Sequence, residues 1–141
     1  MEEERFAYFL KDQLTGLNNH WALESILQIN MHTHEYRYAT VICLENLITF
    51  NRQMGWHNGD ILLEKFAEIL KNRFTHHHIY RIFGDTFVIL SEDFLDLSPD
   101  SLREADFFEN TNITITVTVT HLIEKKIDTI SKLEETISSK K

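Results

Sequence analysis

The clearest pattern along the chain is an alternation of apolar and polar residues over positions 113–120, ITITVTVT. Successive side chains of a β-strand point to opposite faces of its sheet, so this alternation predicts a strand with one buried face. A different pattern occupies positions 38–44, YATVICL, where a short, nearly continuous apolar run is rich in β-branched residues. Such a run is typical of a strand that is buried on both faces.

Apolar residues at helical spacing separate these strands. The spacing predicts helices over residues 3–14, 21–31 and 59–74, shorter helices over 47–55 and 98–108, and a polar helix over 129–141. Asn18 or Asn19 is a suitable N-cap for the second helix, and Asn58 is a suitable N-cap for the helix over 59–74.

Residues 79–91, IYRIFGDTFVILS, predict a β-hairpin with Gly84 and Asp85 as its two-residue loop. Glycine suits this loop because it adopts positive φ without a steric penalty. Helices and strands are therefore interleaved, and at least two strands are antiparallel neighbours. The expected fold class is α+β, with a mainly antiparallel sheet flanked by helices.

The composition of the chain argues against several classes of protein. The chain has 141 residues, 43% of them hydrophobic, which suits one core and is too little for two ordinary domains. Its 22 acids outnumber 14 lysines and arginines and no basic stripe is present, which argues against binding of nucleic acid. No apolar run approaches the roughly 20 residues that span a bilayer, and the N-terminus opens with acids, so we expect no membrane insertion and a cytoplasmic location.

Three segments, taken together and in this order, resemble motifs of the GGDEF family of diguanylate cyclases. KDQLTGLNN (11–19) is similar to the family's D-x-L-T-G-L-x-N-R motif, with His20 where arginine is usual. NRQMGWHNGDILL (51–63) is similar to N-D-x-x-G-H-x-x-G-D-x-x-L. RIFGDTFVIL (81–90) is similar to the R-Y-G-G-D-E-F signature and the strand after it. Each motif alone is weak, whereas the combination is specific.

The resemblance implies the palm-like fold of nucleotide cyclases, an antiparallel sheet with helices. It divides the chain into an N-terminal signalling helix (1–15) and a GGDEF domain (16–141). It also implies a bacterial protein of cyclic di-GMP signalling, a pathway in which family members condense two GTP molecules across a dimer with Mg²⁺ as cofactor. The implied partners are GTP, a second copy of the chain, or another GGDEF or EAL phosphodiesterase domain.

The positions that would hold Mg²⁺ depart from the family pattern. Cys43 stands where the family has its first metal-binding aspartate, and a neutral thiol is a poor ligand for Mg²⁺. Phe83 replaces the first glycine of the signature and Thr86 replaces its second acid, so Asp85 is left as a remnant of the metal site. Phe83 would also obstruct the approach of a triphosphate to the turn. Glu45 lies on the same strand face as Cys43 if the strand extends that far, and is a candidate to rescue the site.

The positions that would hold guanine are retained. Asn51 and Asp60 match the two family residues that hydrogen-bond the base, and an amide and a carboxylate suit its edge. Both residues also have a simpler explanation, because the helix dipole favours an acid in a first turn and an asparagine near a helix end can satisfy backbone groups. The phosphate contacts are less well retained. Ile48 replaces a basic residue of the family, and Lys141 only falls near the position of its phosphate-binding lysine.

Two other kinds of site are not expected. The family's R-x-x-D motif for product inhibition falls on Phe74 and His77, so this pattern lacks the inhibitory cyclic di-GMP site. The run 76–78 is HHH, and adjacent loop histidines rarely converge on one metal, so we interpret them as surface or edge-strand residues.

Three hypotheses follow. The leading one is a catalytically inactive GGDEF domain that acts as a regulatory module through GTP sensing or dimerisation, which Asn51 and Asp60 favour. The second is an active diguanylate cyclase whose atypical Mg²⁺ site uses Asp85 and Glu45. It is disfavoured because each lost charge partner of a transition state costs about 3 kcal/mol. The third is a purely structural dimerisation domain with a vestigial nucleotide cleft.

Overall fold

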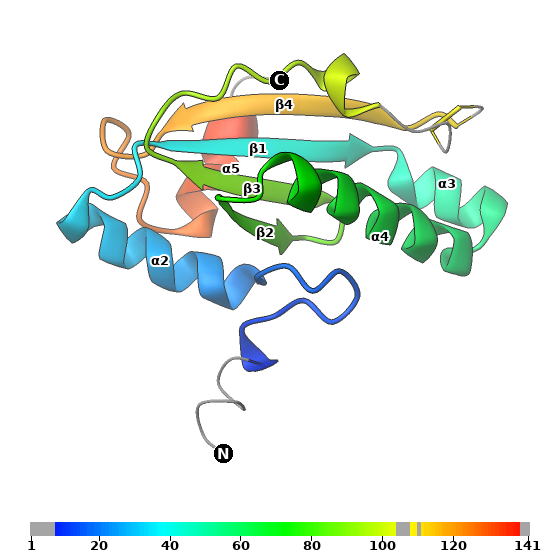
Figure 1. Cartoon of the computed structure of the whole chain (residues 1–141), viewed down its shortest axis with the longest axis horizontal. Coiled ribbons are helices and arrows are strands. Elements are labelled where there is room, and N and C mark those ends of the chain that lie inside the picture. Colours follow the sequence, from blue (N-terminus) through cyan, green and yellow to red (C-terminus); the bar gives the residue numbers. More distant parts are fainter. Residues whose placement is uncertain (1–7, 104–107, 110, 139–141) are drawn as a thin grey trace.

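The computed structural model describes residues 8–103, 108–109 and 111–138 of the chain. Its centre is a four-stranded sheet in the order β2-β3-β1-β4, in which every neighbouring pair is antiparallel (Figure 1). The strands are β1 (Tyr38–Glu45), β2 (His78–Ile82), β3 (Thr86–Ser91) and β4 (Thr114–His121). The expected α+β class with an antiparallel sheet is confirmed.

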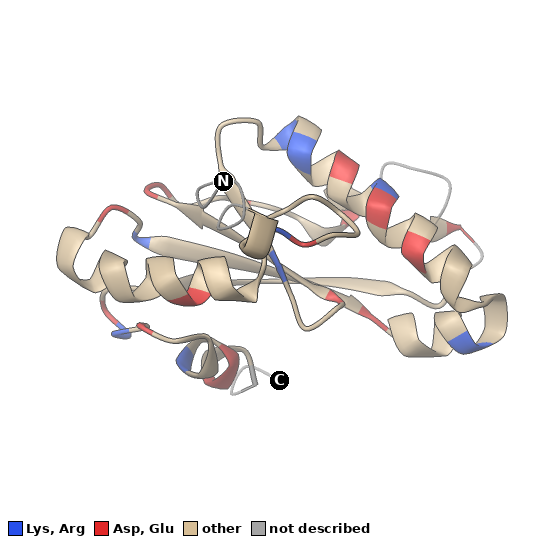
Figure 2. Cartoon of the chain, turned by 90° about the horizontal axis from the view of Figure 1, so that it is seen from below, with Lys and Arg blue, Asp and Glu red and all other residues tan. Residues whose placement is uncertain are grey.

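Helices cover both faces of this sheet (Figure 2). One face carries α3 (Leu47–Met54), α4 (Trp56–Arg73) and the 3-10 helix η1 (Pro99–Leu102), and the other carries α2 (His20–Thr33) and α5 (Ile130–Ser138). Two apolar clusters fill the spaces between these layers, one around Phe66 and Phe87 and the other around Leu23 and Val88. In the described part of the chain, no helix is long and apolar enough to cross a membrane.

The strand positions explain how the two predicted patterns are buried. β1 is an inner strand of the sheet, and helices cover both of its faces, so the run 38–44 is largely buried, as predicted. β4 is an edge strand, and its alternation is only partly reflected in burial. Ile115 is buried as expected, but Thr120 is buried too, because it lies opposite Ala39 on the face covered by α2 and α5.

The N-terminal segment differs from the helix predicted over residues 3–14. Residues 1–7 lie outside the described part, and residues 8 and 9 are helical, but Lys11 already forms a β-bridge with Asn18. The helix ends here because the Asp12 side chain accepts the Thr15 N–H and hydroxyl hydrogens, which favours a turn over a helix. The boundary between residues 1–15 and 16–141 stays a prediction.

Asn18 attaches this N-terminal segment to the outer edge of β2. Its N–H donates to the Ile79 carbonyl at 3.2 Å, and its own carbonyl accepts the Arg81 N–H at 2.8 Å. The Asn18 side chain adds a second donor to the Ile79 carbonyl, at 3.2 Å. Asn19 then caps α2 by accepting the Ala22 N–H, which confirms one of the two predicted caps.

The junction between α3 and α4 is tighter than predicted, and Asn58 is not a cap. Gly55, with φ of 91°, ends α3 and directly precedes α4, which begins at Trp56. Asn58 therefore lies inside the helix, and its side chain donates to the Met54 carbonyl at 2.6 Å. A single glycine makes the turn, so no polar loop is needed.

Candidate functional site

The hairpin turn between β2 and β3 is one residue longer than predicted. Ile82 pairs with Thr86, which leaves Phe83, Gly84 and Asp85 in the turn. Phe83 and Gly84 both have positive φ, at 52° and 79°. The Phe83 side chain is 59% exposed and lies at the rim of the neighbouring cavity. A bulky residue therefore occupies a backbone conformation that favours glycine.

Arg81 holds this turn and joins two of the sequence motifs. Its Nε donates to the Gly84 carbonyl at 2.9 Å, and its Nη1 contacts both carboxylate oxygens of Asp12, at 3.0 and 3.1 Å. Asp12 also accepts from the Thr15 N–H and hydroxyl at 3.0 and 2.6 Å. Burial alone would raise the pKa of Asp12, but the Thr15 hydrogen bonds and the Arg81 guanidinium outweigh it and hold that pKa below 3.8. Both motifs are evident in the sequence, but neither pattern indicates that Asp12 and Arg81 form a pair.

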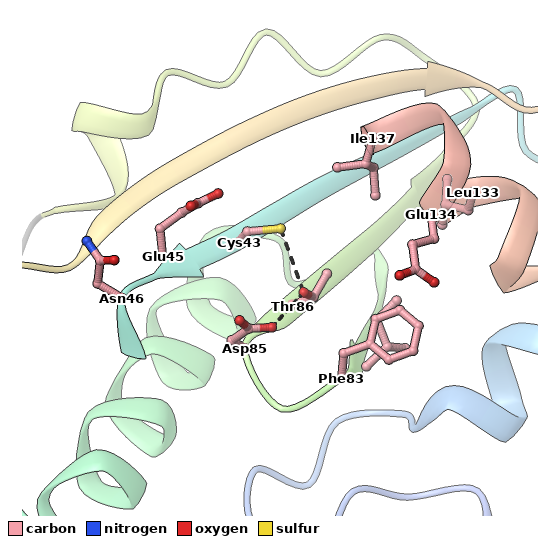
Figure 3. A pocket seen from close by; sticks show the side chains of 10 residues that line it. Cys43, Glu45, Asn46, Phe83, Asp85, Thr86, Leu133, Glu134 and Ile137 are labelled. Atoms are coloured by element: carbon pink, nitrogen blue, oxygen red, sulfur yellow. Dashed lines mark hydrogen bonds between the residues drawn. The ribbon is translucent and has the colours of Figure 1, made fainter. Parts of the chain in front are cut away.

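A cavity of about 320 Å³ opens beside the turn (Figure 3). The end of β1 supplies Cys43 and Glu45, the hairpin supplies Asp85 and Thr86, and α5 closes the opposite side with residues that include Glu134. The turn is fixed to β1, because the Asp85 carbonyl accepts the Leu44 N–H at 2.9 Å. The sequence-predicted metal positions are thus brought together around one space.

Hydrogen bonds in this cavity show which of the Thr86 and Cys43 side chains donates to which partner. The Thr86 hydroxyl donates to Asp85 Oδ1 at 2.9 Å, and Cys43 Sγ lies 3.7 Å from the same hydroxyl oxygen. A hydroxyl has one hydrogen, so the Cys43 thiol must be the donor in its contact with Thr86. Cys43 is therefore a neutral thiol here, and Thr86 already occupies one oxygen of Asp85.

The donor set does not fit Mg²⁺. That ion prefers near-octahedral oxygen coordination, whereas the turn offers one carboxylate, a hydroxyl and a neutral thiol. β1 does extend to Glu45, which lines the same cavity, but its carboxylate points away from Asp85 (Figure 3). The described residues contain no group of three or more histidine, cysteine, aspartate or glutamate side chains that could hold a metal ion.

The two predicted guanine residues lie apart from this cavity, at the junction of α3 and α4. Asn51 is 5% exposed, and its Oδ1 has no hydrogen-bond partner among the described residues. Gly59 packs directly against it, because a Cβ at that position would lie 1.7 Å from Asn51 Oδ1. Asp60 is exposed and lies beyond the first turn of α4, so the dipole explanation for this acid loses its basis.

The remaining candidate positions are scattered. Ile48 is 59% exposed on α3. The rings of Phe74 and His77 meet edge to face, with centroids 5.7 Å apart. Lys141 lies outside the described residues.

Comparison with known proteins gives this arrangement a context. The family model for the diguanylate cyclase GGDEF domain matches residues 9–132. A diguanylate cyclase/phosphodiesterase from Caldicellulosiruptor saccharolyticus has a similar structure, with a TM-score of 0.67 and 16% identity over 91% of this chain and 82% of that one. Among proteins with curated descriptions, none matches this chain by sequence.

Two other similar structures contain cyclic di-GMP. The coiled coil and GGDEF domain of DgcB from Caulobacter crescentus, in complex with c-di-GMP, has a TM-score of 0.67 and 18% identity over 83% of this chain and 71% of that one. The S helix-GGDEF-EAL structure of LapD from Vibrio cholerae, bound to c-di-GMP, has a TM-score of 0.65 and 16% identity over 89% of this chain and 35% of that one. The chain thus spans about a third of the LapD structure.

Proposed function

Because the chain belongs to the GGDEF domain family of diguanylate cyclases, we propose that it is a regulatory domain of bacterial cyclic di-GMP signalling that does not form cyclic di-GMP itself. The family reaction joins two GTP molecules, and its phosphoryl transfer requires negative charge to be neutralised by metal ions. The proposed domain has the fold of the family, but it binds a ligand instead of catalysing the family's reaction.

The observation that carries this proposal is the hydrogen-bond chain from Cys43 through Thr86 to Asp85. It supports the proposal because a thiol and a hydroxyl stand at positions where the family resemblance expects carboxylates for Mg²⁺, and because Thr86 engages the carboxylate that remains. Loss of one positioned charge partner costs about 3 kcal/mol of transition-state stabilisation, so two losses would reduce the rate by roughly 10⁴-fold or more.

The proposal also names a ligand, a guanine nucleotide bound at the junction of α3 and α4. Asn51 has a buried amide oxygen next to Gly59 with no hydrogen-bond partner among the described residues, and Asp60, the residue after Gly59 in α4, is exposed. An amide and a carboxylate are complementary to the edge of guanine. We therefore assign GTP, without turnover, as the ligand of this region. Mg²⁺ would enter only with the triphosphate that it neutralises.

A regulatory domain of this kind acts by changing the activity of a partner protein or domain. The LapD and DgcB structures join their GGDEF domains to an EAL domain and to a coiled coil, respectively. By analogy, we propose a second copy of this chain, or a GGDEF or EAL domain, as the partner that responds to the nucleotide.

One observation favours an active cyclase as the second candidate. Glu45 lies on β1, two residues beyond Cys43, and lines the cavity that contains Asp85. A rotation of its side chain about its bonds would give the turn a second carboxylate.

A turnover and binding experiment separates these functions. The protein is incubated with GTP and Mg²⁺, the products are separated by chromatography, and GTP is titrated by calorimetry in parallel. We expect saturable heat and no cyclic di-GMP.

Variants of α4 test the guanine contact. Asp60→Ala should weaken GTP binding by about tenfold, as expected for a lost charge-assisted hydrogen bond. His57→Ala, which changes an exposed residue on the same helix, should leave GTP binding unchanged. Cyclic di-GMP that depends on Glu45 would establish the second candidate, and absence of both product and heat would leave a structural dimerisation role.

A gain-of-function variant tests the metal argument directly. The variant Cys43→Asp with Phe83→Gly and Thr86→Glu restores the family's residues at three positions and should raise the Mg²⁺-dependent affinity for GTP. The matched control adds Asp85→Asn to these changes, and should lose the gain. If the restored variant binds GTP no more tightly than the natural chain, the cavity is closed to nucleotide for reasons other than its metal ligands.

A further inference from the structure

A second cavity, of about 270 Å³, lies at the end of the sheet opposite the hairpin turn, near Tyr38 of β1. Its lining consists of His34, Arg37, His121 and Ile123, and we call it the Arg37 cavity. Figure 1 shows this end of the molecule, where α2 leads into β1 and β4 ends. The register confirms the separation from the signature, because Tyr38 pairs with Ser91 and His121, whereas Cys43 pairs with Thr86.

The residues that line the Arg37 cavity include a cation and no acid, although the chain as a whole is acidic. The protein has a formal net charge of −8, yet no acidic side chain is among the lining residues of this cavity. The Arg37 side chain forms no hydrogen bond or ion pair within the described part of the molecule, whereas Arg81 is fully engaged by Asp12 and Gly84. A guanidinium that lacks a carboxylate partner in so acidic a chain is a ready anion ligand.

His121 can donate a hydrogen bond to a ligand through its Nε2 atom. Its Nδ1 accepts the Glu124 N–H at 3.1 Å, so Nδ1 carries no hydrogen. The hydrogen of the neutral ring must then be on Nε2, and that nitrogen is the donor left for a ligand. The ring is also held by an edge contact with Tyr38, with centroids 5.1 Å apart.

The backbone that carries Arg37 and His34 is fixed before any ligand arrives. The Arg37 N–H donates to the Ser91 carbonyl at 3.0 Å, and the Arg37 carbonyl accepts the Leu122 N–H at 2.7 Å. His34 ends α2 in a left-handed conformation with φ of 53°. The fully buried Asn30 side chain bonds both backbone groups of Tyr36, at 2.8 and 2.9 Å, and so braces the loop between them. The backbone of the site is therefore already in place, and only the exposed side chains of Arg37 and His34 remain to be ordered by a ligand.

We propose that the Arg37 cavity binds an oxyanion of the phosphate class. The planar guanidinium of Arg37 matches two oxygens of such an anion, and the imidazoles of His34, the residue after α2, and of His121, the last residue of β4, can donate to others. The cavity is larger than one phosphate, and Ile123 forms an apolar wall, so a phosphomonoester with a small organic group fits better than the free ion.

The test is a titration of the full chain followed by nuclear magnetic resonance of its backbone and arginine side chains. Inorganic phosphate and phenyl phosphate are added separately, with sodium chloride at matched ionic strength as the reference. We expect saturable shifts at residues 34, 37 and 121 with both phosphates and tighter binding of phenyl phosphate. Equal affinities would assign the site to free phosphate, and shifts that only follow ionic strength would overturn the proposal.

Variants make the assignment specific. Arg37→Ala should weaken phosphate binding at least about tenfold, and Arg37→Lys should restore part of it, because an ammonium supplies charge without the fork. His121→Phe keeps the ring against Tyr38 and removes the Nε2 donor, so it should weaken binding by a smaller factor. Arg52→Ala, on the exposed surface of α3, is the matched control and should bind phosphate normally. Unchanged binding by a folded Arg37→Ala variant would refute the site.

Discussion

At the scale of single residues, Phe83 carries the largest conflict between sequence and backbone. A left-handed conformation costs a residue with a Cβ about 1–2 kcal/mol, and glycine avoids this cost. Phe83 adopts it at φ of 52° with its side chain mostly exposed, so little burial offsets the strain. The residue is thus tolerated by the turn but not favoured by it.

The strain at Phe83 can be measured by substitution. Phe83→Gly should be about 1 kcal/mol more favourable for folding than the same change at Phe94, because Phe94 is 58% exposed and has no left-handed backbone. Phe83→Val should destabilise, since β-branched residues fit positive φ worst. Urea unfolding of the three variants gives the comparison. Equal losses for Phe83→Gly and Phe94→Gly would show that the turn relaxes around Phe83.

Other single residues show where sequence reasoning reached its limit. The position of the Asp85 turn (though not its length), the strand over 38–44 and the cap at Asn19 were predictable, because each depends on local chemistry. Asn30 was not, since it interrupts an apolar stripe and its burial is explained only by the two Tyr36 hydrogen bonds that it makes after α2 has ended. A buried amide with partners formed by tertiary structure leaves no periodic signal.

At the scale of elements, the close packing of α3 against α4 depends on one missing side chain. Gly59 lies against the Asn51 amide, and a Cβ there would come 2.7 Å from Asn51 Cγ and closer still to Oδ1. The sequence predicted both helices but placed a polar cap between them. It could not predict the contact between Asn51 and Gly59, which depends on how the two helices cross.

A double-mutant cycle tests this contact. In an Asn51→Ala background, Gly59→Ala should stabilise the protein by about 1 kcal/mol, the usual advantage of alanine over glycine within a helix. In the natural background the same change forces the Asn51 side chain out of its place, so it should be less favourable by at least about 1 kcal/mol. The free energy of unfolding is measured for all four proteins. Additive effects would mean that Asn51 swings aside freely.

At the scale of the whole molecule, Arg81 and Asp12 join the N-terminal segment to the signature hairpin. The two side chains are only 14% and 20% exposed, so their contact is poorly screened by solvent. A hydrogen bond to a charged group contributes about 1.5–3 kcal/mol. The fold could be predicted from hydrophobic patterns and motifs, but this long-range pairing could not, because no local pattern states which arginine an acid will meet.

The lowered pKa of Asp12 predicts how stability depends on pH. The folded state holds this carboxyl below its usual pKa of 3.8, so the unfolded state binds more protons between the two pKa values. The contribution of Asp12 to stability is therefore fully present above about pH 4 and is lost as the pH falls through the folded pKa. Asp12→Asn should lower the free energy of unfolding by about 2 kcal/mol at pH 6 and by progressively less below pH 4.

Denaturant unfolding between pH 2.5 and pH 7 gives both curves. Asp96→Asn, which removes an exposed acid elsewhere, controls for the change in net charge. A difference between the natural chain and Asp12→Asn that stays constant down to pH 2.5 would contradict the assigned role of the carboxylate.

The attachment of Asn18 to β2 also limits how this sheet can grow. The outward-facing carbonyl of Ile79 and N–H of Arg81 are both satisfied by Asn18, so the β2 edge offers an incoming strand few free groups for ladder pairing. A peptide that joined the sheet by strand addition would therefore add beside β4, the other outer strand. The same short N-terminal contact that braces the signature hairpin thus guards the molecule against edge-to-edge aggregation on that side.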